Sequence, residues 1–154
     1  MKRRIWICLF AIAAACSVPA KTSTTAPEPA QDIERRDQPV TAADLRILVR
    51  ADEILSAPAA WNRHDTRDCP AGEQTWSLFC ALHDASIEVL GEYRHRAVAL
   101  QEVRFAVEDA TKGIELEHRM MDYNNMPSTR FEDIKRILAV ATERVRARLA
   151  TPSK

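Results

Sequence analysis

The chain has 154 residues, enough for one domain and some accessory sequence. Its 22 basic and 22 acidic residues balance, and the absence of a basic tail or stripe argues against a dedicated nucleic-acid-binding protein. Only three glycines and 6% aromatic residues disfavour a β-sandwich with glycine-rich turns, whereas abundant Ala, Leu, Glu and Arg favour helices. We therefore expect an all-α fold.

The N-terminus has the pattern of a bacterial secretion signal. Residues 1–4 are positively charged, and residues 5–15 form an uncharged apolar run, too short for a membrane-spanning helix of about twenty residues. Small residues before Cys16 resemble the lipobox of bacterial lipoproteins, in which the cysteine is acylated and becomes the new N-terminus. We predict a signal peptide over residues 1–15 and a lipid on Cys16. The alternative is cleavage at an Ala-x-Ala sequence, which would release a soluble periplasmic protein.

Residues 16–40 are predicted to be a disordered linker. They contain four of the eight prolines, together with Thr, Ser, Ala and Glu, and have almost no apolar periodicity. Such a composition cannot bury enough apolar surface to fold, and it behaves as a semi-extended spacer. A tether between the lipid anchor and a folded domain is its expected role. By resemblance to enteric sorting rules, Ser17 after the lipidated cysteine favours the outer membrane.

Residues 41–150 are predicted to form a compact four-helix domain. Thr41 and Asp44 resemble a capping box at the start of the first helix. An apolar face with helical spacing follows as far as Leu55, and Pro58 ends the helix. A loop is expected from residue 58 to about residue 75.

The second helix is expected over residues 76–90, with Gly91 at the position after a helix where a left-handed conformation is common. Its apolar arc is wide, so we predict that it is the central, mostly buried helix. A third helix is expected over residues 93–112. Residues 114–127 predict a short helical turn and then a loop.

The last helix carries the clearest local signals. Thr129 and Glu132 form the pattern of a capping box, and a regular apolar face follows. Pro152 lies just past the expected end of the helix at residue 150. The sequence therefore predicts that the Thr129 side chain caps this helix.

Two cysteines, Cys69 and Cys80, remain once Cys8 and Cys16 are assigned to the signal. Two cysteines eleven residues apart in an oxidising compartment most simply form a disulfide. Closing so short a loop would stabilise the domain by about 3 kcal/mol. We predict this disulfide.

A zinc site is a second interpretation of the same region. Its ligands would be Cys69, Cys80 and His83, with His64 or Asp68 as the fourth. Cys80 and His83 share one helix face at a separation of three residues. The paired spacing typical of zinc-binding cysteines is missing, however.

A third interpretation makes Cys80 a nucleophile, because a helix start lowers the pKa of a thiol. His83 or His118 would then be the base. No glycine-rich oxyanion feature surrounds Cys80, and His83 falls among apolar residues on the helical wheel. A hydrogen-bonded core histidine is the simpler interpretation of His83.

The loop after the first helix is the candidate ligand site. Trp61, Asn62, His64 and Asp65 form a polar loop with one aromatic anchor, and loops carry function more often than cores. Residues 122–125 also carry side-chain oxygens that could coordinate a cation, but their spacing fits no calcium loop. Asn before a helix is usually part of a turn.

Residues 41–149 resemble a family of small uncharacterised bacterial and phage proteins, a helical domain of unknown function. The matching features are an amphipathic helix followed by a tryptophan, a Cys-Ala pair in a buried helix, and a Trp-Asn-Asp-x-Pro-type turn before a final helix that starts at Thr. They are found in residues 51–55 with Trp61, in residues 79–82, and in residues 123–127 with Thr129. Tyr123, Asn125 and His83 depart from the Trp, Asp and Gly of that pattern. The resemblance implies a helical domain and no known activity.

Together these patterns predict an exported, lipid-anchored envelope protein that faces the periplasm. We expect a non-enzymatic binding or structural module without a cofactor, whose partner is another envelope protein or a cell-wall component. The alternative is a small periplasmic enzyme or metal-binding protein that uses Cys80, His83 and the loop of residues 61–69.

Overall fold

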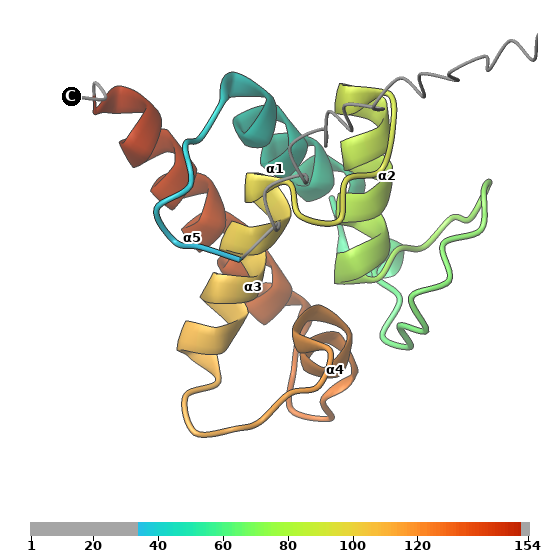
Figure 1. The fold of residues 1–154 in the computed structure, drawn as a ribbon. Coiled ribbons are helices and arrows are strands. Elements are labelled where there is room, and N and C mark those ends of the chain that lie inside the picture. The colour runs from blue at the N-terminus through green and yellow to red at the C-terminus, as the bar shows by residue number, and fades with distance from the viewer. Residues whose placement is uncertain (1–33, 152–154) are drawn as a thin grey trace, which may run out of the picture. The chain divides into compact units, whose positions relative to one another are not determined.

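The computed structural model describes residues 34–151 and contains five α-helices and one 3-10 turn, with no β-strand among these residues (Figure 1). The all-α fold expected from the sequence is confirmed. The predicted signal peptide, the lipidation site Cys16 and the linker up to residue 33 lie outside the described residues. The elements are α1 (Ala42–Ile54), η1 (Pro58–Ala60), α2 (Leu78–Leu90), α3 (Val98–Ala110), α4 (Arg119–Asn125) and α5 (Phe131–Ala150).

Side chains from all five α-helices form one hydrophobic core. Helix α1 packs against α2, α3 and α5, and α3 packs in addition against α4 and α5. Burial of such apolar side chains is the main favourable term in folding. The large apolar side chains that are fully buried are Ile47, Leu48, Leu55, Leu78, Leu82, Leu100, Val103, Val107, Ile134, Leu138 and Val145. No helix within residues 34–151 is both long and apolar enough to cross a membrane.

The start of α1 and the end of α2 are as predicted. Thr41 and Asp44 form a reciprocal capping box, and Gly91 ends α2 in the left-handed conformation with φ of +80°. Asp44 also has a second role. Its Oδ1 accepts a hydrogen bond of 3.1 Å from the backbone N–H of Ala99, in the first turn of α3. One buried carboxylate therefore caps two helices.

The predicted start of α3 was wrong, and α2 is not the most completely buried helix although more than half of its residues are buried. Helix α3 begins at Val98 rather than near residue 93, because its capping carboxylate is Asp44 of α1. The most completely buried helix is α3, in which every residue from 99 to 107 is buried, and not α2. The first half of α2 is buried, but Ile87 in its second half is 40% exposed.

Residues 34–40, predicted to belong to the linker, lie against α3. The backbone N–H of Arg35 donates to Gln101 Oε1 at 3.1 Å, and Gln101 Nε2 donates to Gln38 Oε1 at 3.1 Å. The guanidinium of Arg36 lies 4.4 Å from the centre of the Phe105 ring. These contacts cover the polar face of α3, and they explain why Gln101 is buried. The folded domain therefore includes residues from 34 onward.

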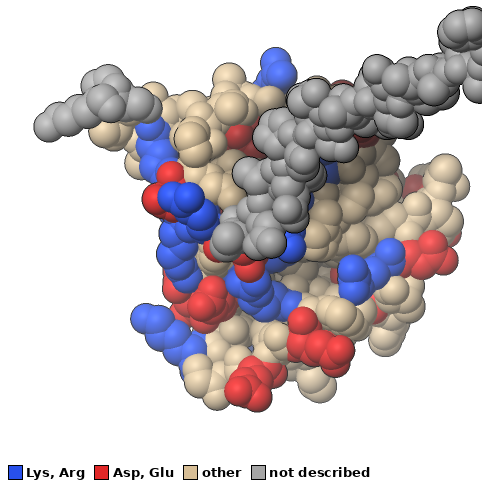
Figure 2. Space-filling view, in the orientation of Figure 1, with Lys and Arg blue, Asp and Glu red and all other residues tan. Residues whose placement is uncertain are grey.

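Ion pairs join this segment, α3 and α5. Asp109 of α3 is contacted by Arg36 at 3.2 Å and by Arg144 of α5 at 2.6 Å. Arg148 near the end of α5 pairs with Glu102 of α3. Figure 2 shows the result as blue and red side chains that alternate over the side of the molecule where α3 and α5 lie.

The predicted capping box at Thr129 was wrong. The residue before α5 is Arg130, whose backbone N–H donates to the Asp133 carboxylate at 3.0 Å. The Thr129 hydroxyl is buried and donates instead to the carbonyl oxygen of Tyr123 at 2.7 Å. It thus gives a second hydrogen bond to a carbonyl oxygen in the last turn of α4, which also accepts from the backbone N–H of Met126 at 3.3 Å. The acidic residue of the cap is Asp133 and not Glu132.

Candidate functional site

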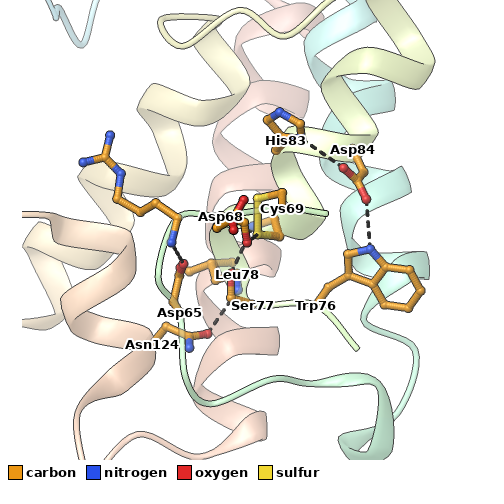
Figure 3. The surroundings of a disulfide bond; sticks show 11 residues. Asp65, Asp68, Cys69, Trp76, Ser77, Leu78, His83, Asp84 and Asn124 are labelled. Carbon is orange, nitrogen blue, oxygen red and sulfur yellow. Dashed lines mark hydrogen bonds and ion pairs between the residues drawn. A yellow bond between two sulfur atoms is a disulfide. The ribbon is translucent and has the colours of Figure 1, made fainter. Parts of the chain in front are cut away.

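Cys69 and Cys80 form a disulfide, as the sequence predicted (Figure 3). Their Cα atoms lie 5.4 Å apart. Cys80 is in the first turn of α2, where its backbone N–H donates to the hydroxyl of Ser77 at 3.1 Å. With both sulfurs bonded to each other, neither is a thiol that could attack a substrate or bind zinc.

The predicted ligand loop is attached to the rest of the domain through Trp61 and Asn62. The backbones of residues 60–62 and Trp76 pair, with Asn62 N–H to Trp76 O at 2.9 Å and Trp76 N–H to Ala60 O at 2.8 Å. The indole N–H of Trp61 donates to Asn124 Oδ1 at 2.8 Å. Trp61 therefore anchors the loop to α4.

Asn62, His64 and Asp65 line a cavity of about 190 Å³ next to the disulfide. Asp65 is buried, and its Oδ1 accepts from the backbone N–H of Arg67 at 2.7 Å, whereas its Oδ2 has no hydrogen-bond partner. The backbone of Asp65 exchanges two hydrogen bonds with the Asn125 side chain, of 2.7 and 2.8 Å. In the part of the chain that the structure describes, no three His, Cys, Asp or Glu side chains are grouped as metal ligands.

His83 and His118, the two proposed bases, lie in different environments. His83 Nδ1 is 2.9 Å from Asp84 Oδ1, and the other oxygen of Asp84 accepts from the Trp76 indole N–H at 2.9 Å (Figure 3). The His83 ring also packs on Tyr93, with 4.7 Å between ring centres. His118 lies next to the Arg67 guanidinium, at 3.4 Å.

The oxygen-bearing side chains of residues 122–125 face different partners. Asp122 Oδ2 accepts from the backbone N–H of His118 at 2.8 Å, at the start of α4. Asn124 is fully buried between the loop and α2, and Asn125 bonds the Asp65 backbone. The structure therefore does not bring these oxygens together around one point.

A second, larger cavity of about 320 Å³ was not predicted from the sequence. We call it the arginine cavity, because four arginines line it together with two histidines, two carboxylates and three apolar side chains. The lining residues are Glu34, Arg67, Phe79, His95, Arg96, Arg104, Glu117, His118, Arg119, Met120 and Met121. They come from widely separated parts of the chain, from residue 34 to residue 121, so no spacing in the sequence relates them. The only local signal is the cationic stretch of residues 94–96.

Arg104 and Glu34 lie at the centre of the electrostatics of this cavity. Arg104 is only 8% exposed, and its Nη2 donates to the carbonyl oxygen of His95 at 2.8 Å. The carboxylate of Glu34 lies 3.8 Å from Arg104 Nη1 and also bonds Arg119. Burial lowers the pKa of the Arg104 guanidinium, and the charge of Glu34 opposes this shift.

Comparisons with known proteins do not identify the domain: no protein-family model, no curated protein and no solved structure matches the chain. The resemblance to a small helical domain of unknown function stays a prediction. The function is therefore argued from the chemistry of the residues described above.

Proposed function

We propose that this protein is an exported, lipid-anchored protein of the bacterial cell envelope and that its helical domain is a non-enzymatic binding module. The lipid would be on Cys16, and the partner would be another envelope protein or a cell-wall component. The charged start, the short apolar run and the small residues before Cys16 support the export and the anchor. The proline-rich residues that follow would act as a spacer between the lipid anchor and the helical domain.

The observation that carries this proposal is the disulfide between Cys69 and Cys80. Disulfides persist in oxidising compartments such as the periplasm and are rare in the cytosol. The bond closes the loop in front of α2, and so it favours a structural role for both cysteines. It also removes the free Cys80 thiol on which the zinc and the nucleophile interpretations depend.

The surroundings of His83 argue against a role as a catalytic base. Its ring nitrogen faces Asp84, and Asp84 in turn holds the indole of Trp76. This chain of contacts ends on an aromatic side chain that anchors the loop and not on a nucleophile. The predicted ligand loop uses most of its polar groups in the same way, to hold the fold.

Replacing Cys16 tests the anchor. We expect the wild-type protein to fractionate with membranes and to carry a lipid-modified N-terminal cysteine. Cys16→Ala should move the protein to the soluble fraction or stall its processing. Cys8→Ser is the matched control, because it removes a cysteine from the same signal and should leave the fractionation unchanged. An unlipidated mature N-terminus, with Cys16→Ala still fractionating as the wild type, would contradict the proposal.

A further inference from the structure

We propose that the arginine cavity binds a small ligand through an anionic group, a carboxylate or a phosphate, and that Glu34 takes the place of that group in this structure. The inference rests on the proposed binding function but not on the lipid anchor. A cavity of about 320 Å³ is of the size that holds small molecules. Four arginines and two glutamates line it, so its formal charge favours an anion.

Arg104 is the most deeply buried of the four arginines that line the cavity. It is buried, and a buried cation is stable only when opposite charge and hydrogen bonds replace the water it has lost. Arg104 Nη2 donates to the carbonyl oxygen of His95 at 2.8 Å and lies 3.3 Å from the Nε2 of the same residue, so both of these partners are uncharged groups of His95. The 3.8 Å between Arg104 Nη1 and Glu34 Oε1 is too long for another. Glu34 thus supplies charge to Arg104 without a hydrogen bond.

Glu34 fills the cavity imperfectly. Its Oε2 accepts from Arg119, but its Oε1 is buried and has no hydrogen-bond partner. A buried acceptor without a donor costs free energy. The carboxylate of Glu34 is attached to the chain, whereas the anionic group of a free ligand can turn to accept from Arg104 and Arg119 together. Guanidinium groups bind carboxylates and phosphates best in such paired geometries.

With Glu34 in place, the lining of the cavity still holds four arginines against two glutamates. Burial lowers the pKa of His95, and the charges of Arg104, Arg67 and Arg96 lower it further, while Glu34 acts in the opposite direction. The three arginines together therefore oppose a further positive charge at this point. An incoming anion would relieve this repulsion.

The segment that carries Glu34 can leave the cavity without unfolding a helix. Residues 34–38 lie outside the helices. They are held to α3 by the hydrogen bonds of Arg35 and Gln38 with Gln101, and by Arg36, which pairs with Glu108 and Asp109 at 3.3 and 3.2 Å. The Arg36 side chain is 51% exposed, and exposed ion pairs add little stability. The anionic group of a ligand would therefore compete with the Glu34 carboxylate for the arginines and could displace it from the cavity.

Arg67 reaches the cavity from a strained backbone. Its φ is +62°, in the left-handed region that residues other than glycine rarely occupy. The carboxylate of Asp65 holds this conformation by accepting the Arg67 N–H at 2.7 Å. Strain of this kind is concentrated at binding and active sites, where it positions a side chain.

Titration calorimetry of the full-length protein in a nonionic detergent tests the inference, with inorganic phosphate and succinate as probes at low ionic strength. Glu34→Gln removes the competing charge and should raise the affinity several-fold. Arg119→Gln should lower it about tenfold or more, the effect of one hydrogen bond between charged groups. Arg136→Gln is the control, because it removes an exposed arginine of α5 that does not line the cavity, and it should leave the affinity unchanged.

The source of the anionic group is tested in the same samples. Phosphatidylglycerol in mixed micelles, with phosphatidylcholine as the uncharged control, is compared with the soluble probes. Binding of the lipid alone, abolished by Arg119→Gln, assigns the cavity to a headgroup, and binding of phosphate or succinate assigns it to a free anion. Either result supports an anion site.

Two outcomes would overturn the inference. One is that folded Glu34→Gln protein, checked by its circular dichroism, binds none of the probes. The other is that Arg119→Gln and Arg136→Gln change the affinity equally. Because a gain of affinity in Glu34→Gln cannot arise from misfolding, that variant remains informative if Arg119→Gln is unstable. Calorimetry is independent of membrane fractionation, so failure here is distinguishable from failure of the anchor proposal.

Discussion

Asn124 joins three parts of the domain through one side chain. Its Oδ1 accepts from the Trp61 indole at 2.8 Å and from the backbone N–H of Leu78 at 3.1 Å. Its Nδ2 donates to the carbonyl oxygen of Asn62 at 3.0 Å. The Leu78 N–H belongs to the first turn of α2, where backbone donors have no partner within the helix. The Asn124 side chain of α4 thus helps to cap α2, and it also holds the loop that precedes α2 in the chain.

We expect Asn124→Ala to lower the free energy of unfolding by about 3 kcal/mol, because several buried polar groups lose their partner together. Urea denaturation followed by circular dichroism measures this. Asn62→Ala is the control of the same residue type. The Asn62 side chain makes one exposed hydrogen bond, to the backbone of His64, so its loss should cost less than about 1 kcal/mol. Equal effects of the two changes would contradict the central role of Asn124.

At the scale of the helices, the boundaries that depend on neighbouring residues could be predicted. Thr41 with Asp44, and Gly91, gave the start of α1 and the end of α2, because caps of this kind act over three or four residues. The start of α3 could not be predicted, because its cap comes from Asp44, 55 residues earlier in the chain. The capping box predicted at Thr129 failed for a related reason. The Thr129 hydroxyl bonds the preceding helix α4 and not the following helix α5.

The difference between local and long-range contacts also applies to the two cavities. The disulfide and its loop lie within residues 61–80, where the cysteine spacing predicted the bond and the polar residues after Trp61 indicated the loop. The arginine cavity combines side chains from residue 34 to residue 121, and each arginine taken alone is typical of a solvated surface. They are brought together by the packing of α3, α4, the start of α2 with the loop before it, and residues 34–40.

Thr129→Asp distinguishes the two roles of that residue. Asp is a good capping residue, so a true cap would tolerate the change. Because the Thr129 hydroxyl donates to the carbonyl oxygen of Tyr123, we expect Asp to lose this bond and to lower the free energy of unfolding by more than about 1 kcal/mol. Ser128→Asp adds the same charge at an exposed neighbouring position and should be nearly neutral. A stability of Thr129→Asp equal to that of the control would restore the capping interpretation.

At the scale of the whole molecule, the disulfide supports a small core. The loop between α1 and α2 contains little regular structure, and the bond ties it to the first turn of α2. A cross-link of this kind stabilises mainly by limiting the freedom of the unfolded chain. Its benefit therefore extends to the whole cooperative unit and not to the loop alone.

We expect Cys69→Ser and Cys80→Ser each to lower the free energy of unfolding by about 3 kcal/mol. The double variant should match the single ones, because the same bond is lost in all three. Denaturation midpoints of the purified proteins measure this, and intact mass before and after reduction reports the bond itself. Two alkylatable thiols in the unreduced protein would contradict the disulfide, as would destabilisation of the wild type by a chelator.

The place where the chain enters the folded domain has a mechanical consequence. Residues 34–38 are joined to the helices by contacts that follow one another along the chain, from Glu34 with Arg119, through Arg36 with Asp109, to Gln38 with Gln101. A force applied to the chain upstream of residue 34 would act on these contacts one after another, beginning with that of Glu34. It would reach the hydrophobic core only after they had broken. The first contact to open would be that of Glu34, so tension on the chain would uncover Arg104 and Arg119 while the helices stayed packed.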